Sequence, residues 1–280
     1  MGDTDLQTYS GFLSKMKGTL NTPIDYRLPL GSLEVHLNPL LGREILLEFT
    51  GRMECVSCGR AIKKSYQQGH CFPCTQTLAS CDLCILKPEL CHFDRGTCRE
   101  PEWGKAHCMK DHFVYMANSS GLKVGITRAV NIPTRWIDQG AVQALAVFKV
   151  STRFQSGRME VLFKQHMADK TNWRTMLKGD TDPVDLLRKR AEITDLCREE
   201  LGRLSRESGL NQIHPLPDEK PLELSYPVLE YPTRIKSYNF DKTPKIQGRL
   251  MGIKGQYLML ADGVLNIRKF SGYEVIFGIK

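Results

Sequence analysis

Four cysteines in the first third of the chain are spaced to bind one metal ion. They form two C-x2-C pairs separated by twelve residues, namely Cys55 with Cys58 and Cys71 with Cys74. Two such pairs place four thiolates tetrahedrally around Zn²⁺. The alternative is a disulfide framework, which is disfavoured because the first residues lack the pattern of a secretory signal. We therefore predict a structural zinc site, since four thiolates leave no open position for water.

Five more cysteines follow within residues 81–108, and three histidines accompany them up to residue 112. This set exceeds the needs of one four-ligand site, so spacing alone does not select the ligands. Cys81 and Cys84 are the first choice because they form a third C-x2-C pair, and Cys91 and Cys98 complete a predicted second zinc site. A redox pair formed by Cys81 and Cys84 is the alternative. The substitute ligands that remain open are Cys108, His92, His107 and His112.

Residues 112–172 contain a regular succession of apolar runs. Residues 113–117 and 122–127 flank an Asn-Ser-Ser-Gly segment, which predicts a β-hairpin because these residues tolerate turn geometry. A third apolar run covers residues 144–150. Residues 159–167 then place Met159, Phe163 and Met167 on one helical face. The predicted order is strand, strand, short helix, strand, helix.

This order and its residues resemble the GIY-YIG endonuclease domain. Residues 113–115 (Phe-Val-Tyr) stand where the family has its first motif, and 123–125 (Lys-Val-Gly) where it has the second. Residues 131–135 (Asn-Ile-Pro-Thr-Arg) are similar to the segment that carries the family's catalytic arginine. Glu160 lies where the metal-binding glutamate is expected, and Asn172 matches a late asparagine. The sequence departs from the pattern at Lys123, which replaces the second tyrosine, and at Gln139, where many members have a histidine.

The resemblance implies hydrolysis of phosphodiester bonds. That reaction needs a base or water-positioning group, a cation for the developing phosphate charge and a divalent metal. The resemblance implies that Tyr115 is the base or water-positioning group and that Arg135 is the cation. It also implies that Glu160 binds the divalent metal, which is Mg²⁺ or Mn²⁺. Lys123 replaces the second tyrosine as an electrostatic group, or it marks a domain that only binds. The candidate catalytic residues are Tyr115, Arg135, Glu160, Lys123 and Asn172.

A wider similarity extends over most of the chain. Residues 96–99, 119–128, 133–141 and 171–174 resemble an uncharacterised family of bacterial proteins known only as a domain of unknown function. The resemblance implies a bacterial cytoplasmic protein. It adds polar and aromatic residues that could share one cleft and bind nucleic acid: Arg128, Trp136, Trp173 and Arg174. Both tryptophans could stack on bases, and packing in the core is the alternative for each.

The two ends of the chain favour β structure. Residues 8–16, 32–37 and 43–49 read as strands near the N-terminus, and four short strands are predicted between residues 245 and 279. Because the second group is small for an independent sheet, we expect it to complete a barrel with the first.

Two other segments connect these regions. One helix is predicted over residues 181–209, with Asp182 as N-cap, Pro183 at the first position and Gly209 at the end. Its predicted buried face comprises Leu187, Ala191, Thr194, Cys197, Leu201 and Leu204. Five prolines between residues 211 and 232 predict an ordered surface connection without regular structure.

Composition and charge bound the function. The 280 residues are 41% hydrophobic and 25% charged, as in ordinary globular proteins, and no apolar run approaches a membrane span. We therefore expect a cytoplasmic protein with no membrane partner. Residues 111–180 hold ten Lys and Arg against five Asp and Glu, which is +5 of the formal net charge of +8. This excess suits a polyanionic ligand.

These observations combine into one prediction. The fold class is α+β, with a GIY-YIG-like domain (a three-stranded antiparallel sheet with helices), a zinc-ribbon-like segment and a small β domain from the two termini. The predicted divisions are 1–52, 53–110, 111–210 and 211–280. The predicted function is a zinc-binding protein that cleaves DNA or RNA. The alternative is an inactive zinc-stabilised module that binds nucleic acid, or a protein through the terminal β segments.

Overall fold

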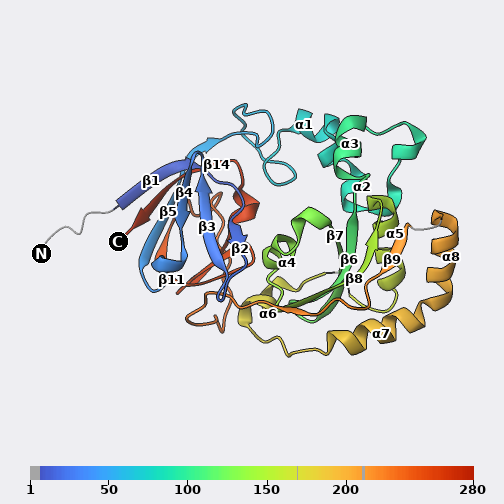
Figure 1. The fold of residues 1–280 in the computed structure, drawn as a ribbon. Coiled ribbons are helices and arrows are strands. Elements are labelled where there is room, and N and C mark those ends of the chain that lie inside the picture. The colour runs from blue at the N-terminus through green and yellow to red at the C-terminus, as the bar shows by residue number, and fades with distance from the viewer. Residues whose placement is uncertain (1–6, 169, 210–211) are drawn as a thin grey trace, which may run out of the picture. The chain divides into compact units, whose positions relative to one another are not determined.

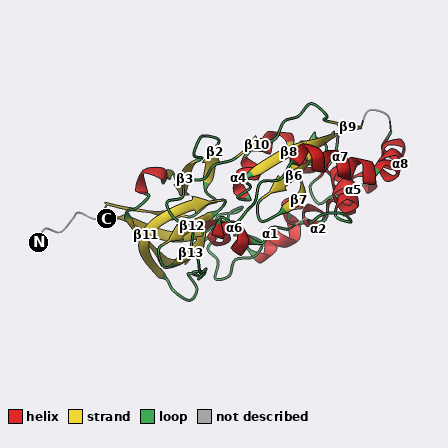
Figure 2. Cartoon of the chain, turned by 90° about the horizontal axis from the view of Figure 1, so that it is seen from below, coloured by secondary structure: helices red, strands yellow, loops and turns green. Residues whose placement is uncertain are grey.

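The computed structural model describes residues 7–168, 170–209 and 212–280. It divides the chain into two compact units. The first contains the chain up to Gln76, Leu177–Gly179 and Leu224–Lys280, and the second contains Thr77–Met176 and Asp180–Glu223. Strands dominate the first unit, whereas the longer helices belong to the second (Figure 2). The predicted mixed α+β class is confirmed.

The first unit joins strands from both ends of the chain. In its six-stranded antiparallel sheet, β14 lies between β1 and β5, so both terminal segments share one sheet (Figure 1). A second antiparallel sheet has three strands. The six strands, in spatial order, are β1 (Gln7–Phe12), β14 (Tyr273–Ile279), β5 (Glu44–Met53), β11 (Lys245–Lys254), β12 (Tyr257–Leu260) and β13 (Gly263–Asn266). The others are β2 (Lys17–Thr19), β3 (Asp25–Leu30) and β4 (Leu33–His36), with 3-10 helices η1 (Asn38–Leu40) and η6 (Ile267–Phe270).

Aromatic packing fills the core of this unit. The rings of Phe240 and Phe270 are 4.8 Å apart at their centroids, and Phe49 and Tyr273 are 4.9 Å apart. Burial of a large apolar side chain contributes roughly 1.5–3 kcal/mol, so this cluster is a main source of stability. The prediction that the termini build one β domain is confirmed as a shared sheet.

A buried lysine interrupts this apolar interior. Lys254 is fully buried at the end of β11, and its Nζ has no hydrogen-bond partner within the described chain. The ammonium lies 5.4 Å from the ring centroid of Tyr226 and 5.3 Å from that of Tyr231, which provides cation–π contact. Burial lowers the pKa of Lys254 to about 8.

This burial predicts a pH-dependent stability. The unfolded lysine keeps its usual pKa near 10.5, so between about pH 8 and pH 10.5 the unfolded state binds more protons than the native state. The unfolding free energy contributed by Lys254 is therefore lowest below pH 8 and recovers as pH rises to 10.5. We expect Lys254→Met to stabilise the protein at pH 7 by roughly 2 kcal/mol, after allowance for the ring contacts. Urea unfolding of the wild type and the variant at pH 7 and pH 10 tests this. A difference in unfolding free energy between the two proteins that does not become smaller at pH 10 contradicts the prediction.

The second unit is an antiparallel sheet covered by helices. The hairpin of β6 (His112–Asn118) and β7 (Leu122–Arg128) and the third strand, β8 (Gln143–Val150), confirm the three predicted strands. One face carries Val114, Met116 and Val124, which pack against Met159 and Phe163 of α5 (Arg153–Phe163). The other elements of this unit are α2 (Leu83–Leu86), α3 (Pro101–His107), α4 (Thr134–Asp138), α7 (Leu186–Leu196), α8 (Arg198–Ser208), β9 (Ile213–Pro215), β10 (Leu222–Glu223), η2 (Ala79–Cys81), η3 (Pro88–Leu90), η4 (Phe93–Arg95) and η5 (Ala129–Asn131). Helix α1 (Phe72–Thr77) belongs to the first unit except for its last residue, and α6 (Trp173–Lys178) is divided between the two units.

The long helix predicted over residues 181–209 is wrong in its extent. The segment forms two helices, α7 and α8, that meet at Cys197. Asp185, and not Asp182, caps α7, because its side chain accepts a hydrogen bond from the Arg188 amide. The buried face also differs from the prediction, since Leu187 is 44% exposed and its neighbour Leu186 only 1%. Gly209 ends α8 as predicted.

The proline-rich connection also differs from the prediction. Residues 213–215 and 222–223 form β9 and β10, and both pair with β8. Pro215 lies at the end of β9, where its missing amide costs no internal ladder bond. This segment therefore extends the sheet of the second unit.

Candidate metal centres and polar site

The four cysteines of the first unit converge as their spacing predicts. The Sγ atoms of Cys55, Cys58, Cys71 and Cys74 all lie within 4.8 Å of one another. Those of Cys58 and Cys71 are 3.8 Å apart. Four thiolates at about 2.3 Å from a tetrahedral Zn²⁺ are about 3.8 Å apart, so this tetrad is compatible with a structural zinc site.

Local turns hold the tetrad in place. Gly59 has a φ of +68° directly after the first pair, and its amide donates to the carbonyl of Cys55 over 2.9 Å. The Cys71 amide donates to the Cys55 Sγ over 3.2 Å. Burial raises the pKa of the Cys55 thiol, but backbone amides of Cys58, Cys71 and Ser57 outweigh it and bring the pKa to about 6. With this pKa, the thiolate form of Cys55 predominates at neutral pH, and the thiolate is the form that binds a metal ion.

The second unit brings together another four cysteines. Cys84, Cys91, Cys98 and Cys108 line one small cavity, beside Ile85, Phe93, Trp103 and Gly104. Cys108, an alternative in the predicted ligand set, is among the residues that line this cavity. Cys81 is buried at the end of η2 and is not among the described residues that line the cavity.

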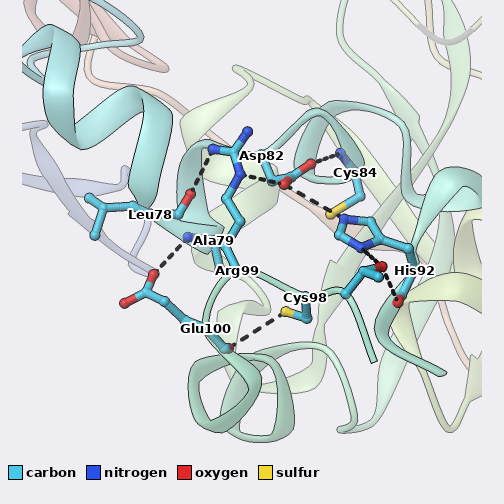
Figure 3. Close-up of polar contacts among 9 residues, drawn as sticks. Leu78, Ala79, Asp82, Cys84, His92, Cys98, Arg99 and Glu100 are labelled. Carbon is cyan, nitrogen blue, oxygen red and sulfur yellow. Dashed lines mark hydrogen bonds and ion pairs between the residues drawn. The ribbon is translucent and has the colours of Figure 1, made fainter. Parts of the chain in front are cut away.

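A charged network borders this cavity (Figure 3). Asp82 caps α2 by accepting from the Cys84 amide over 3.2 Å, and its other oxygen lies 2.7 Å from Nε of Arg99. The same oxygen lies 3.6 Å from Nε2 of His92, whose Nδ1 is 2.8 Å from the Thr97 hydroxyl. Asp82, Cys84 and His92 thus form a compact group with ligand atoms within 4.8 Å. Arg99 already neutralises its carboxylate.

The other two histidines have separate environments. His107 stacks on Trp103 at 4.2 Å, and its Nδ1 lies 2.9 Å from the Trp103 carbonyl. His112 is fully buried, and burial lowers its pKa to about 4. Its Nδ1 lies 2.7 Å from the carbonyl of Lys110. Neither histidine is among the described residues of the cavity wall.

Three candidate catalytic residues of the second unit influence one another electrostatically. Tyr115 of β6 is fully buried, and its hydroxyl accepts from Nε2 of Gln139 over 2.6 Å. Burial raises the pKa of Tyr115, while the charge of Arg135 and the Gln139 hydrogen bond act to lower it and Glu160 acts to raise it. Tyr115, Arg135 and Glu160 are therefore electrostatic neighbours, although they come from β6, α4 and α5.

The hydroxyl of Tyr115 fits because its partner on β7 is a glycine. Tyr115 lies opposite Gly125 in the β6–β7 register. A Cβ atom at Gly125 would be only 2.6 Å from the tyrosine hydroxyl. Gly125 therefore makes room for the hydroxyl of Tyr115.

Lys123 and Asn172 lie in a second group of polar residues. Lys123 is on the same face of the hairpin as Tyr115, because it lies opposite Ala117 in the register. It is 5% exposed, and its ammonium donates to the Thr171 hydroxyl. Asn172 uses its side-chain oxygen to accept from the amides of residues 174 and 175, which begins α6. Its position supports the helix start.

The predicted nucleic-acid contacts differ in exposure. Trp136 is 6% exposed and packs edge-on against Tyr115 at 5.9 Å, so its ring faces are not open to a base. Trp173 is half-buried, and the exposed Arg174 guanidinium lies over its ring at 4.3 Å. Arg128, at the end of β7, is also half-buried. Trp173 and Arg174 therefore offer the more accessible stacking and cationic groups.

The sequence pattern gives no role to two residues that make polar contacts in the second unit, Gln139 and Arg153. Gln139 departs from the family pattern, yet its side chain donates a hydrogen bond to the hydroxyl of Tyr115. Its spacing of four from Arg135 on a short helix was the available signal. Arg153 is half-buried, and its Nη2 donates to the carbonyl of Ile85 over 2.6 Å. Its position directly after the cap Thr152 does not by itself indicate such a contact.

Comparison with known proteins gives one match. The model of the family described as "Protein of unknown function (DUF2797)" matches residues 42–275. Searches of curated proteins and of solved structures each gave no match. Across the described parts of the chain, none of the helices combines the length and apolar character needed to cross a bilayer. The match covers well over half of the chain, which therefore belongs to the DUF2797 family.

Proposed function

We propose that the protein acts on the phosphodiester backbone of nucleic acid through a site made by Tyr115, Arg135 and Glu160. The observation that carries this proposal is the electrostatic proximity of the three side chains, which come from three separate elements. Arg135 is half-buried and so remains partly open to a ligand. Its guanidinium suits a phosphate oxygen, because a planar cation can donate two parallel hydrogen bonds.

The residues present fit a divalent cation. Glu160 offers one carboxylate, with its side chain 14% exposed and 3.5 Å from the ammonium of Lys164. Mg²⁺ is commonly held by one or two carboxylates and keeps several waters. The Oε1 of Gln139 is buried and has no hydrogen-bond partner among the described residues, so this site retains an unused acceptor. A bound cation would stabilise charge that develops on the phosphate.

Tyr115 has a narrower role in this scheme. Its raised pKa keeps the hydroxyl neutral at physiological pH. A neutral, fully buried hydroxyl is a poor general base, so we assign it to holding Gln139 and Arg135 in position. Trp136, which packs on Tyr115, supports the same arrangement. We assign nucleic-acid contact to Arg128, Trp173 and Arg174.

A second candidate function is binding without cleavage. Two observations favour it: the burial of Tyr115, and the presence of Lys123, also buried, where the second tyrosine of a GIY-YIG domain would stand. The GIY-YIG fold itself remains part of our proposal. Under either function, affinity should fall steeply with salt, because cationic side chains displace counterions from the backbone.

One experiment separates the two functions. Purified protein is incubated with labelled single-stranded, duplex and branched DNA and with RNA, in Mg²⁺, Mn²⁺ or EDTA, beside Glu160→Gln. Cleavage is expected in Mg²⁺ or Mn²⁺ only, and Glu160→Gln should bind but not cut. Cleavage in EDTA, or equal cleavage by the variant, would contradict the assigned metal role. Binding without any cutting selects the second function, and absence of binding to all four substrates rejects both.

A further inference from the structure

Three residues with different ligand atoms meet at the small cavity of the second unit. The ligand atoms of Asp82, Cys84 and His92 all lie within 4.8 Å of one another (Figure 3). All three residues line the same cavity, whose volume is about 10 Å³. A single water-sized sphere occupies roughly that volume. The space beside the three residues therefore accommodates one small ion and excludes a larger occupant.

The carboxylate of Asp82 and the ring of His92 are separated by nearly the distance that a shared metal ion would set. Oδ2 of Asp82 lies 3.6 Å from Nε2 of His92, which is too long for a hydrogen bond. Zinc binds oxygen and nitrogen ligands at about 2.0–2.1 Å, so two such ligands of a tetrahedral ion lie about 3.3 Å apart. The observed separation therefore fits two ligands of one ion better than it fits a hydrogen-bonded pair.

A hydrogen bond from Thr97 determines which nitrogen of His92 offers a lone pair. The Thr97 hydroxyl donates its one proton to the His92 carbonyl over 3.3 Å. The same oxygen lies 2.8 Å from Nδ1 of His92, so it accepts the proton of that nitrogen. In the neutral ring, Nε2 then carries the lone pair and is directed toward the Asp82 carboxylate. A cation between these two electron-rich atoms would remove their repulsion.

The residues that support the two side chains belong to one short segment. His92 precedes η4, and Gly96 ends that helix with a φ of +70°, so that the chain turns and Thr97 returns to His92. Two residues later, Nε of Arg99 lies 2.7 Å from Oδ2 of Asp82. Metal ligands in proteins are oriented by hydrogen bonds of this kind from a second layer of residues. The segment thus fixes both candidate ligands before an ion binds.

Asp82 keeps a position for an ion although two groups already bond to it. Its Oδ1 accepts from the Cys84 amide over 3.2 Å, and its Oδ2 is paired with Arg99. A carboxylate has about four lone-pair positions, so these bonds orient the group without exhausting it. A carboxylate and two thiolates would bring three negative charges to a divalent ion, and Arg99 balances the one that remains.

We propose that Asp82, Cys84 and His92 bind a single zinc ion, with one cysteine of the same cavity wall as the fourth ligand. The mixed set of oxygen, nitrogen and sulfur suits Zn²⁺, which is tetrahedral and four-coordinate in structural sites. This site lies in the second unit, whereas the four-cysteine tetrad belongs to the first, and it does not depend on the proposed action on nucleic acid. The wall offers three thiols for the fourth position: Cys91, Cys98 and Cys108.

The zinc content of the full chain tests this proposal. His92→Ala should carry one zinc ion fewer than the wild type, whether or not the tetrad of the first unit is loaded. His107→Ala is the matched control and should lose none, because His107 stacks on Trp103 and is not among the described residues of the cavity wall. Equal zinc content in His92→Ala and the wild type would overturn the proposal.

Two conservative variants keep the test independent of folding. Thr97→Val removes the partner of Nδ1 at an exposed position and should weaken zinc affinity roughly 10–100-fold. Asp82→Asn keeps an oxygen that can cap α2 but removes the charge, so its loss of affinity should be larger. Competition with a chelator measures both. Unchanged affinity in Asp82→Asn would contradict the assignment of Asp82 as a ligand.

Cobalt provides a spectroscopic probe of the ligand set. In Cys55→Ser, bound Co²⁺ should report on the second unit, with weaker sulfur-to-cobalt absorption than the tetrad gives in His92→Ala, because two thiolates bind the ion instead of four. One of three further substitutions should abolish this signal and so identify the fourth ligand. Loss of the ion from all three, or a spectrum of four thiolates, would overturn the proposal. The three substitutions are Cys91→Ala, Cys98→Ala and Cys108→Ala.

Discussion

Cys55→Ser should release one zinc ion and unfold the segment between β5 and α1. The tetrad lies in two turns between β5 and α1, and a zinc ion bound there would supply most of the stability of these turns. Structural zinc in small fingers contributes on the order of 10 kcal/mol at neutral pH. The first unit has its own core, so we expect a smaller loss there, of about 3–5 kcal/mol. Zinc analysis and calorimetry measure the two effects.

The control separates metal loss from a packing defect. Cys197→Ser also removes a buried thiol, but one that is not in the tetrad. It should keep the zinc and lose only the packing contribution, roughly 1–2 kcal/mol. Addition of a strong chelator should lower the wild-type melting temperature toward that of Cys55→Ser. If Cys55→Ser kept its zinc with unchanged melting, the tetrad would not be the metal site.

Arg135→Ala is expected to abolish most cleavage under the proposed function. Removal of one donor to a developing oxyanion typically reduces kcat by about 10²–10³-fold. Substrate affinity should change much less, because Arg128, Trp173 and Arg174 remain available for binding. Single-turnover cleavage and a separate binding titration distinguish the two effects.

Two further variants sharpen this test. Arg135→Lys keeps the charge but loses the bidentate geometry, so it should restore part of the rate only. Arg174→Ala removes an exposed cation outside the site and should weaken binding and its salt dependence with little effect on kcat. Equal loss of kcat in Arg135→Ala and Arg174→Ala would show that neither acts specifically on the reacting phosphate.

The sequence predicts local geometry well where neighbouring residues determine it. The Cys55 and Cys71 pairs are each completed within four residues, so their spacing already contains the knuckle. The hairpin of β6 and β7 follows from its turn residues and flanking apolar runs. Tyr115, Arg135 and Glu160 could be placed near one another only through a resemblance to a known fold.

Features that depend on tertiary packing could not be predicted. Cys108 lines the cavity of the second unit because of where α3 brings residue 108, and C-x2-C spacing does not encode that position. The break at Cys197 was not signalled by any residue pattern, and packing at the start of α7 buries Leu186 rather than Leu187. The sequence did not distinguish whether Trp136 stacks on a nucleic-acid base or packs in the protein core. Its edge-on contact with the ring of Tyr115 shows that it packs in the core.

The central place of β14 in its sheet bears on how the chain is synthesised. β1 and β5 do not pair with each other, because β14 lies between them and hydrogen-bonds to both. Both early strands emerge from the ribosome more than two hundred residues before their shared partner. Their edges must therefore stay unpaired while the second unit is translated, which is when exposed strand edges are most prone to aggregate. The six-stranded sheet of the first unit therefore cannot be completed until β14 has been translated.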